Sequence, residues 1–349
     1  MKKVLGIFRG FPGLGRVVAG VSLLETLRDK YDCDVKFISY LQGNKYLESR
    51  GYVDLQEVTS MDYCSIGLLP TNKMGVHIHN TIKNFIPDVI IIDGEPLILQ
   101  SIKISHSNLK VVALLNPADV DNPNNDKEAM DFFNAMYSLS DLAIVHGLRL
   151  VNKDERYKKL VSINTILRQE ILTIKNVPTN NIYCILGGGT VNVGQQFEDS
   201  TLKIAELCKK VAMLLPEYTM HIICSSPNIF NKLDRNDNPV NVLLHKDIIP
   251  AEQYYTDACL VITRSGRNTL SELAYLGIPA ISFVTGCSYR KTEQSNNIND
   301  LQTQTIISDS LEITPIKLSE LCRKRIGKRI NDNILRCGND EAVKYILQL

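Results

Sequence analysis

The sequence predicts an α/β protein made of two doubly wound, Rossmann-like domains. The chain has 349 residues, its short apolar runs alternate with longer amphipathic ones, and a polar stretch divides this alternation into two series. A chain of this length exceeds the size at which one hydrophobic core usually stops growing, so two domains are expected. The alternation is typical of βα units that build a parallel sheet covered by helices on both faces.

The first series predicts an N-terminal domain over residues 1–174. An amphipathic helix is expected over residues 17–31, where apolar residues recur at helical spacing. Buried strands are expected where a short run is almost wholly apolar. These runs are residues 4–8, 35–39, 89–93, 111–115 and 142–145.

The second series predicts a C-terminal domain over residues 175–349, which opens with a linker at residues 175–181 that contains a proline and two consecutive asparagines. Charged residues 316–349 predict two or three helices, broken near Gly338. The remaining apolar runs predict strands at 182–186, 220–224, 242–244, 260–263 and 280–284, and helices at 202–215 and 269–276.

The composition is that of an ordinary globular enzyme. Lys and Arg number 39 against 38 Asp and Glu, so the net charge of +1 predicts no general attraction to nucleic acid or to an anionic membrane. The nine cysteines form no C-x-x-C pair, and several lie in apolar runs, as reduced and buried thiols do. No run has the length of a signal peptide or a membrane span. We therefore expect a cytoplasmic protein without an integral membrane segment.

The histidines give no sign of a metal site. Six occur, and none has a ligand spacing such as H-E-x-x-H. We expect no metal ion, and no pattern in the sequence fixes an oligomeric state.

The densest motif is residues 258–280, where a buried strand leads through a short loop with Gly266 into a helix. Backbone N–H groups and the positive end of the helix dipole then face whatever lies beyond the strand, which suits a phosphate group. The alternative is purely structural: Thr269 or Asn268 would cap the helix, and Glu272 in its first turn would interact with the dipole.

Glycines follow two further strands. Three glycines at 187–189 precede Thr190, and such a run lets the backbone approach a ligand closely. A glycine-rich turn at residues 10–16 follows the first strand, but its spacing is not G-x-G-x-x-G and no acidic residue ends the second strand. This departure disfavours an NAD-dependent enzyme.

Two carboxylates, Asp93 and Glu95, follow the apolar strand 89–93. The carboxyl ends of strands in doubly wound sheets open toward the ligand, so either residue is a candidate general base. For each of them alone, helix capping with solvation is the structural alternative.

These motifs resemble those of GT-B glycosyltransferases similar to the bacterial peptidoglycan N-acetylglucosaminyltransferase. In that family the strand is followed by Ser/Thr-Arg-x-Gly-x-x-Thr, a Ser-Glu pair and Gly-x-Pro, and all of these elements occur in residues 258–280. The resemblance is specific at residues 258–297 and weaker at 182–190 and 10–16. It implies two domains that face a central cleft, the N-terminal one binding an acceptor and the C-terminal one a nucleotide-sugar.

The resemblance also implies which residues bind the donor. The loop before the helix approaches the diphosphate, Glu272 accepts hydrogen bonds from the ribose, and Gln294 and Asn297 share one helix face toward the sugar. For Arg168, phosphate binding and a surface ion pair are equally open. The implied donor-binding set is Arg168, Gly188, Gly189, Thr190, Ile248, Ser265, Gly266, Arg267, Asn268, Thr269, Glu272, Gln294 and Asn297.

On the acceptor side the resemblance implies Gly13, Gly15 and Arg16. Arg16 stands where many relatives have His, and a guanidinium cannot accept a proton. We therefore expect Arg16 to contact a phosphate or an acidic acceptor, and Asp93 or Glu95 to act as the base.

The implied reaction is an inverting, metal-independent transfer of a sugar from a nucleotide-diphospho-sugar to an acceptor hydroxyl or amine. The donor is expected to be UDP-linked, such as UDP-GlcNAc or UDP-glucose, and it is a co-substrate, with no further cofactor. Two alternatives remain: a nucleotide-sugar hydrolase or epimerase of the same fold, and a non-catalytic nucleotide-sugar binding protein. The sugar, the base and the acceptor, whether small molecule, lipid-linked or macromolecular, depend on pocket shape and stay open.

Overall fold

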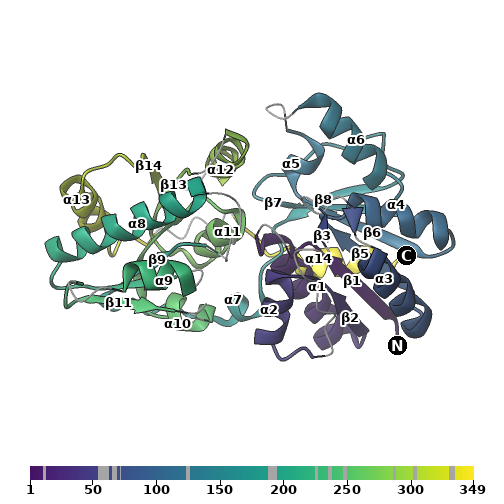
Figure 1. Ribbon diagram of the computed structural model, residues 1–349, viewed down its shortest axis with the longest axis horizontal. Coiled ribbons are helices and arrows are strands. Elements are labelled where there is room, and N and C mark those ends of the chain that lie inside the picture. Colours follow the sequence, from purple (N-terminus) through teal and green to yellow (C-terminus); the bar gives the residue numbers. More distant parts are fainter. Residues whose placement is uncertain are drawn as a thin grey trace. The chain divides into compact units, whose positions relative to one another are not determined.

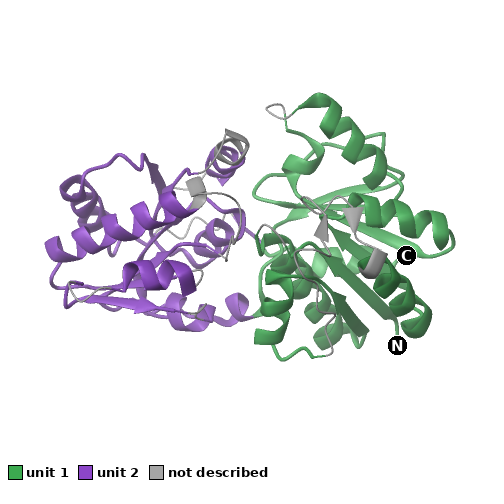
Figure 2. Ribbon diagram, viewed as in Figure 1, with its two compact units in different colours: residues 1–169, 337–349 green, residues 170–336 purple. Residues whose placement is uncertain are grey.

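The computed structural model describes residues 1–10, 13–53, 63–64, 69–70, 72–122, 126–187, 195–224, 227–234, 238–246, 250–285, 288–301, 305–329 and 335–349. The chain divides into two compact units, coloured separately in Figure 2. Unit 1 comprises Met1–Gln169 and Cys337–Leu349, and unit 2 comprises Glu170–Arg336.

The described part of unit 1 contains a six-stranded parallel sheet. Its central strands are buried apolar runs, as the sequence predicts. The strands, in their order across the sheet, are β2 (Asp34–Ile38), β1 (Lys3–Phe8), β5 (Val89–Asp93), β6 (Lys110–Leu115), β7 (Leu142–Gly147) and β8 (Leu160–Asn164). A short antiparallel pair, β3 (Tyr63–Cys64) and β4 (Leu69–Pro70), lies apart from this sheet.

Helices cover both faces of the unit 1 sheet. Along each strand alternate side chains point to opposite faces, and they join two separate apolar clusters, one with α1 and α14 and the other with α3 and α4. The helices of this part of the chain are α1 (Gly15–Tyr31), α2 (Gln42–Ser49), α3 (Asn72–Phe85), α4 (Pro96–Ser105), α5 (Pro117–Val120), α6 (Lys127–Tyr137), α7 (Gln169–Thr173, across the unit boundary) and α14 (Asn339–Leu347).

Unit 2 repeats the same architecture. Its described residues form a second parallel sheet of six strands, with the order β11 (Val242–His245), β10 (Thr219–Ile223), β9 (Asn181–Ile185), β12 (Ala258–Arg264), β13 (Ala280–Phe283) and β14 (Ile306–Asp309). The helices are α8 (Gln195–Leu214), α9 (Pro227–Leu233), α10 (Ala251–Tyr255), α11 (Arg267–Leu276), α12 (Ser288–Leu301) and α13 (Pro315–Arg325).

Each sheet has one point at which the strand order reverses direction. These points lie between β1 and β5 in unit 1 and between β9 and β12 in unit 2. In doubly wound sheets, ligands bind outside the carboxyl ends of the strands at this point. The two places to search for a site are therefore the segments that follow β1 and β5, and those that follow β9 and β12.

The predicted division of the chain requires a correction. The expected boundary between residues 174 and 175 lies between Gln169 and Glu170, and residues 337–349, assigned to the second domain, belong to unit 1. The reason is apolar packing: Ala342, Val343 and Ile346 of α14 are fully buried in the cluster that also contains α1. In Figure 1, α14, in yellow, lies beside α1.

The predicted core strands and the helices α1 and α11 are confirmed with small differences at their ends, whereas α8 begins at Gln195, seven residues before the predicted start. The edge strands β8 and β14 are not among the predicted strands. Only one residue of each is buried, so neither has the continuous apolar run of a central strand. Within the described residues, no helix is long and apolar enough to cross a membrane.

Candidate functional site

The first candidate site is the junction between β12 and α11, which lies at the reversal point of unit 2. All seven residues of β12 are buried, and the strand passes into the loop Ser265–Gly266. Two hydrogen bonds fix Ser265 to the end of β13: its N–H donates to Phe283 O at 3.1 Å, and its hydroxyl donates to Ser282 Oγ at 3.1 Å. Gly266 is exposed and takes the N-cap position of α11. At the amino end of this helix, Ser265 is therefore fixed to the neighbouring strand and Gly266 is exposed to solvent.

The structural alternative for this motif is wrong in its details. Thr269 and Asn268 do not cap the helix, because α11 begins at Arg267 with Gly266 as its N-cap and no side-chain capping bond. The first helical hydrogen bond runs from Leu270 N to Gly266 O. This end of α11 is the positive end of the helix dipole, which makes it suitable for an anion.

Glu272 lies in the second turn of α11, not in the first as predicted, so the helix dipole does not account for it. Its carboxylate is buried and accepts a hydrogen bond at Oε2 from the Tyr255 hydroxyl, at 3.1 Å. Tyr255 is the last residue of α10. Sequence reasoning did not find this tyrosine, because only the folded chain brings α10 and α11 together.

The predicted pair Gln294 and Asn297 lies on α12, as expected, and Asn297 reaches the Ser265–Gly266 loop. Gln294 Oε1 accepts a hydrogen bond from Thr285 N at 2.7 Å, and Asn297 Nδ2 donates to Ser265 O at 3.0 Å. Both amides thus fasten α12 to the segments that follow β12 and β13. No hydrogen bond among the described residues uses Gln294 Nε2 or Asn297 Oδ1, so each amide retains the group that a sugar hydroxyl needs.

Four of the other residues predicted to bind the donor lie outside the part of the chain that the structure describes. Gly187, which opens the glycine run after β9, has φ +92°, a conformation that favours glycine. Gly188, Gly189, Thr190 and Ile248 lie outside the described residues. Arg168 is half-buried and belongs to unit 1, just before α7. Arg267, Asn268 and Thr269 are half-buried in the first turn of α11.

The second candidate site is a group of ionic side chains at the reversal point of unit 1. Arg16, at the start of α1, donates to Asp93 Oδ1 at 2.5 Å and makes two bonds to Asp119, of 2.8 and 3.0 Å. Burial by itself lowers the pKa of Arg16, but the Asp119 and Asp93 charges raise it well above its usual value. Arg16 is thus paired with two carboxylates of its own unit, and the expected contact with a phosphate or an acidic acceptor stays a prediction.

Asp119 was missed by the sequence analysis, although a signal for it exists. It lies on α5, which follows β6, and its Oδ2 also accepts from Asn116 N at 2.8 Å in a capping box. The pattern Asn-Pro-x-Asp after an apolar strand is a helix-start signature. It places a carboxylate at the same sheet edge as Asp93.

Glu95 lies next to this ionic group and differs from Asp93 in its surroundings. It is 2% exposed, accepts a hydrogen bond from the Tyr40 hydroxyl, and has Arg9 Nε 3.6 Å from its Oε1. Burial raises the pKa of Glu95 to about 7, against the opposing effect of the Arg9 charge. It occupies the N-cap position of α4 without a capping bond from its side chain, so helix capping does not explain it.

Gly94, between the two carboxylates, is required by the geometry. Its φ is +82°, and a Cβ there would lie 2.5 Å from Arg16 Cδ and 2.8 Å from Arg9 Cβ. We expect Gly94→Ala to lower the free energy of unfolding by about 2 kcal/mol or more, since it adds both backbone strain and a clash. Urea unfolding measures this.

The matched control is Gly75→Ala in α3, where a Cβ meets nothing within 4 Å. That change is expected to stabilise the protein by up to about 1 kcal/mol, because alanine loses less entropy in a helix. Equal effects of the two substitutions would contradict the steric role assigned to Gly94.

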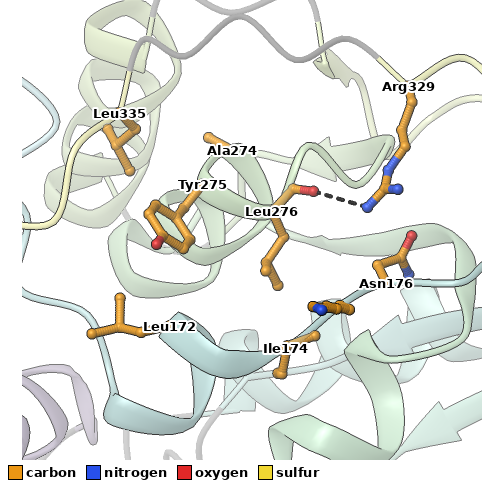
Figure 3. Close-up of a pocket in the computed structure, with 9 residues that line it drawn as sticks. Leu172, Ile174, Asn176, Ala274, Tyr275, Leu276, Arg329 and Leu335 are labelled. Carbon is orange, nitrogen blue, oxygen red and sulfur yellow. Dashed lines mark hydrogen bonds between the residues drawn. The ribbon is translucent and has the colours of Figure 1, made fainter.

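A pocket of about 440 Å³ in unit 2 does not coincide with either candidate site. It is lined by Ala274, Tyr275 and Leu276 at the carboxyl end of α11 (Figure 3). The Ser265–Gly266 loop lies at the amino end of that helix. Leu172 and Asn176 contribute from the segment where unit 2 begins. The helix dipole presents its negative end here, which does not suit a diphosphate.

Metal binding has no visible basis in the described part of the chain. There, no group of three or more His, Cys, Asp or Glu side chains is arranged to hold an ion. Where the described histidines meet, they meet in pairs, His79 with His106 and His221 with His245.

Comparison with known proteins bears on both the fold and the first site. Residues 194–329 match the profile of the Glycosyltransferase family 28 C-terminal domain, a span that contains the β12–α11 loop, Glu272, Gln294 and Asn297. No curated protein matches the chain.

Solved structures match over both units. MurG of Acinetobacter baumannii has a TM-score of 0.61 and 14% identity, and covers 100% of both chains. The glycotransferase of kitacinnamycin has a TM-score of 0.65 and 13% identity, covering 99% of this chain and 98% of its own. UDP-GlcNAc 2-epimerase from Methanocaldococcus jannaschii has a TM-score of 0.58 and 13% identity, over 99% and 100% of the two chains. These likenesses show the two-domain GT-B fold.

The profile match and the shared fold together support a glycosyltransferase that resembles the MurG family. The resemblance stated from the motifs is thereby confirmed, and glycosyl transfer is the activity that the findings support.

Proposed function

We propose that this protein transfers a sugar, with inversion and without a metal ion, from a UDP-linked nucleotide-sugar to an acceptor hydroxyl or amine. The observation that carries the proposal is the amino end of α11, where Gly266 is exposed at the reversal point of unit 2, within a span that matches the Glycosyltransferase family 28 C-terminal domain. Backbone N–H groups and the helix dipole at that end stabilise the charge that develops on the departing diphosphate.

Side chains near the amino end of α11 are assigned to the other parts of the nucleotide-sugar. Glu272 provides carboxylate oxygens for the ribose hydroxyls, and the amides of Gln294 and Asn297, held beside the loop, provide donors and acceptors for the sugar. The glycine run that begins at Gly187 lets the backbone approach the phosphates.

The acceptor is assigned to unit 1, with Glu95 as the general base. A pKa of about 7 suits this role, because at neutral pH a large fraction of the carboxylate is ionised and still basic enough to take a proton. Asp93 is engaged by Arg16 through its Oδ1, so its role in the proposal is to hold Arg16 and the chain around Gly94 in place.

The donor site is tested by thermal unfolding with a panel of nucleoside diphosphates and nucleotide-sugars. A ligand at 100 times its dissociation constant adds about 2.7 kcal/mol to stability, so we expect UDP to raise the Tm of the wild type by about 5–10 °C. Glu272→Ala is expected to remove most of this shift, and Glu252→Ala, which removes an exposed carboxylate on α10, to keep it. No shift with any nucleotide would contradict the proposal.

A nucleotide-sugar hydrolase or epimerase is the second candidate, favoured by the likeness to UDP-GlcNAc 2-epimerase. The two classes separate when the protein is incubated with UDP-GlcNAc alone. Transfer predicts that release of UDP needs an added acceptor, whereas a hydrolase releases UDP from the donor by itself. An epimerase produces a second sugar isomer without any acceptor.

The proposal places the protein in the cytoplasm. Seven cysteines in the described part of the chain are unpaired thiols, six of them buried. Disulfides are rare in the reducing cytosol, so this pattern supports the assignment.

A further inference from the structure

The hydrogen bond between Tyr255 and Glu272 joins two side chains that are both nearly inaccessible. Tyr255 is 1% exposed and Glu272 is 4% exposed, and the phenolic oxygen lies 3.1 Å from Glu272 Oε2. At neutral pH a tyrosine hydroxyl donates its single proton and a carboxylate can only accept. The direction of the bond is therefore fixed, and the buried setting strengthens it.

The backbone and ring of Tyr255 are held by contacts that do not involve Glu272. Asn176 Nδ2 donates to Tyr255 O at 2.7 Å and to Ala258 O at 3.0 Å, which fastens the end of α10 to the start of β12. The Tyr254 ring packs edge-on against the Tyr255 ring, with centroids 4.5 Å apart. The hydroxyl thus comes from a well-anchored ring, and Glu272 is the partner with more rotatable bonds in its side chain.

A carboxylate that binds a vicinal diol must present its oxygens in one plane, in the orientation of the two hydroxyls. Glu272 has several rotatable bonds, and holding it in one rotamer costs entropy if the ligand alone must do so. A fixed donor at Oε2 favours one rotamer in advance, and it uses only one of the several acceptor positions of a carboxylate.

We infer that Tyr255 is a positioning residue that orients Glu272 toward the two ribose hydroxyls of the donor nucleotide. This inference rests on the proposed function, since it assigns a partner to the carboxylate of the proposed donor site. It concerns the hydroxyl alone: the ring fills core space that phenylalanine would fill equally well.

The test measures binding of UDP and of 2′,3′-dideoxy-UDP, which lacks both hydroxyls, by isothermal titration calorimetry. We expect the wild type to bind UDP at least about tenfold more tightly, as hydrogen bonds to a charged group contribute strongly. Tyr255→Phe is expected to weaken UDP binding about five- to tenfold and to leave dideoxy-UDP binding unchanged. In a Glu272→Gln background, Tyr255→Phe is expected to cause no further loss of UDP affinity, because the carboxylate that Tyr255 orients is already absent.

Tyr183→Phe is the matched control. Its hydroxyl is also in the interior of unit 2 and lies 3.0 Å from both Gln253 O and Asp257 Oδ1, two acceptors that share its single proton. It is expected to leave the preference for UDP over dideoxy-UDP unchanged.

The binding results distinguish a failure of the positioning role of Tyr255 from a failure of the proposed donor site. Equal weakening of both ligands by Tyr255→Phe, or additional weakening in the Glu272→Gln background, would overturn the positioning role while leaving the donor site intact. A wild type that binds neither nucleotide would overturn the proposed function and this inference together.

Discussion

Replacing Glu95 with glutamine is expected to lower kcat by about 10²–10⁴, the range that a general base contributes. The amide keeps the size of the side chain and its position near Tyr40 and Arg9, but it cannot take a proton from the acceptor. The measurement is nucleoside diphosphate release under saturating donor, with the acceptor that supports wild-type turnover. Glu155→Gln, an exposed position in the same unit, is the control and is expected to keep wild-type kcat. A Glu95→Gln enzyme with unchanged kcat would exclude Glu95 as the base.

The same residue predicts a pH dependence with a definite sign. The pKa of Glu95 is raised from 4.5 to about 7, so the active, ionised form accumulates as the pH rises and kcat is expected to increase through about pH 7 and then level off.

The free energy of unfolding is expected to change in the opposite direction with pH. A raised pKa in the folded state stabilises the protein below about pH 4.5, and this contribution is lost as the pH rises to about 7. It amounts to about 3 kcal/mol, and Glu95→Gln is expected to remove it from the pH profile of urea unfolding.

Arg16→Leu is expected to produce the largest loss of stability, about 3–5 kcal/mol in the free energy of unfolding. Removing the guanidinium leaves Asp93, which is 0% exposed, and Asp119 facing one another without a cation, and an unpaired buried charge is costly. Because both carboxylates are neutral at low pH, the loss should shrink as the pH falls.

Arg28→Leu provides the comparison on the same helix. The pair between Arg28 and Asp29 is 43% and 51% exposed, so its loss is expected to cost below about 1 kcal/mol. Equal costs for the two arginines would show that the Arg16 group is not a buried ionic network in solution.

The features predictable from the sequence share a physical cause. A strand buried on both faces is a nearly continuous apolar run, so β5, β6 and β12 can be recognised in the sequence. An edge strand such as β14 has one protected residue and no such run. The loop between β12 and α11 was predictable because a buried apolar run, a short segment with Gly266 and a helical run follow one another in the sequence.

The partners of the site residues were not predictable, because they come from distant parts of the chain. Tyr40 reaches Glu95, and Asp119 reaches Arg16, across separations that no spacing rule covers. The same applies to Arg16 itself: its residue type suggested an anion from outside, and only the fold shows that two internal carboxylates satisfy it. Motifs therefore locate a site, while its electrostatics depend on tertiary packing.

The assignment of Cys337–Leu349 to unit 1 has a consequence for how the protein is made. Unit 2 is a continuous segment, so all of it can leave the ribosome and fold while its neighbour is still incomplete. Unit 1 is complete only when α14 has been made, because the buried side chains of α14 are part of the apolar cluster that contains α1. The hydrogen bonds from Lys2 Nζ to Ile346 O and Leu347 O also depend on α14. During synthesis unit 1 therefore begins first and is completed last, and the apolar side chains of α1 that pack against α14 have no such cover until unit 2 has emerged.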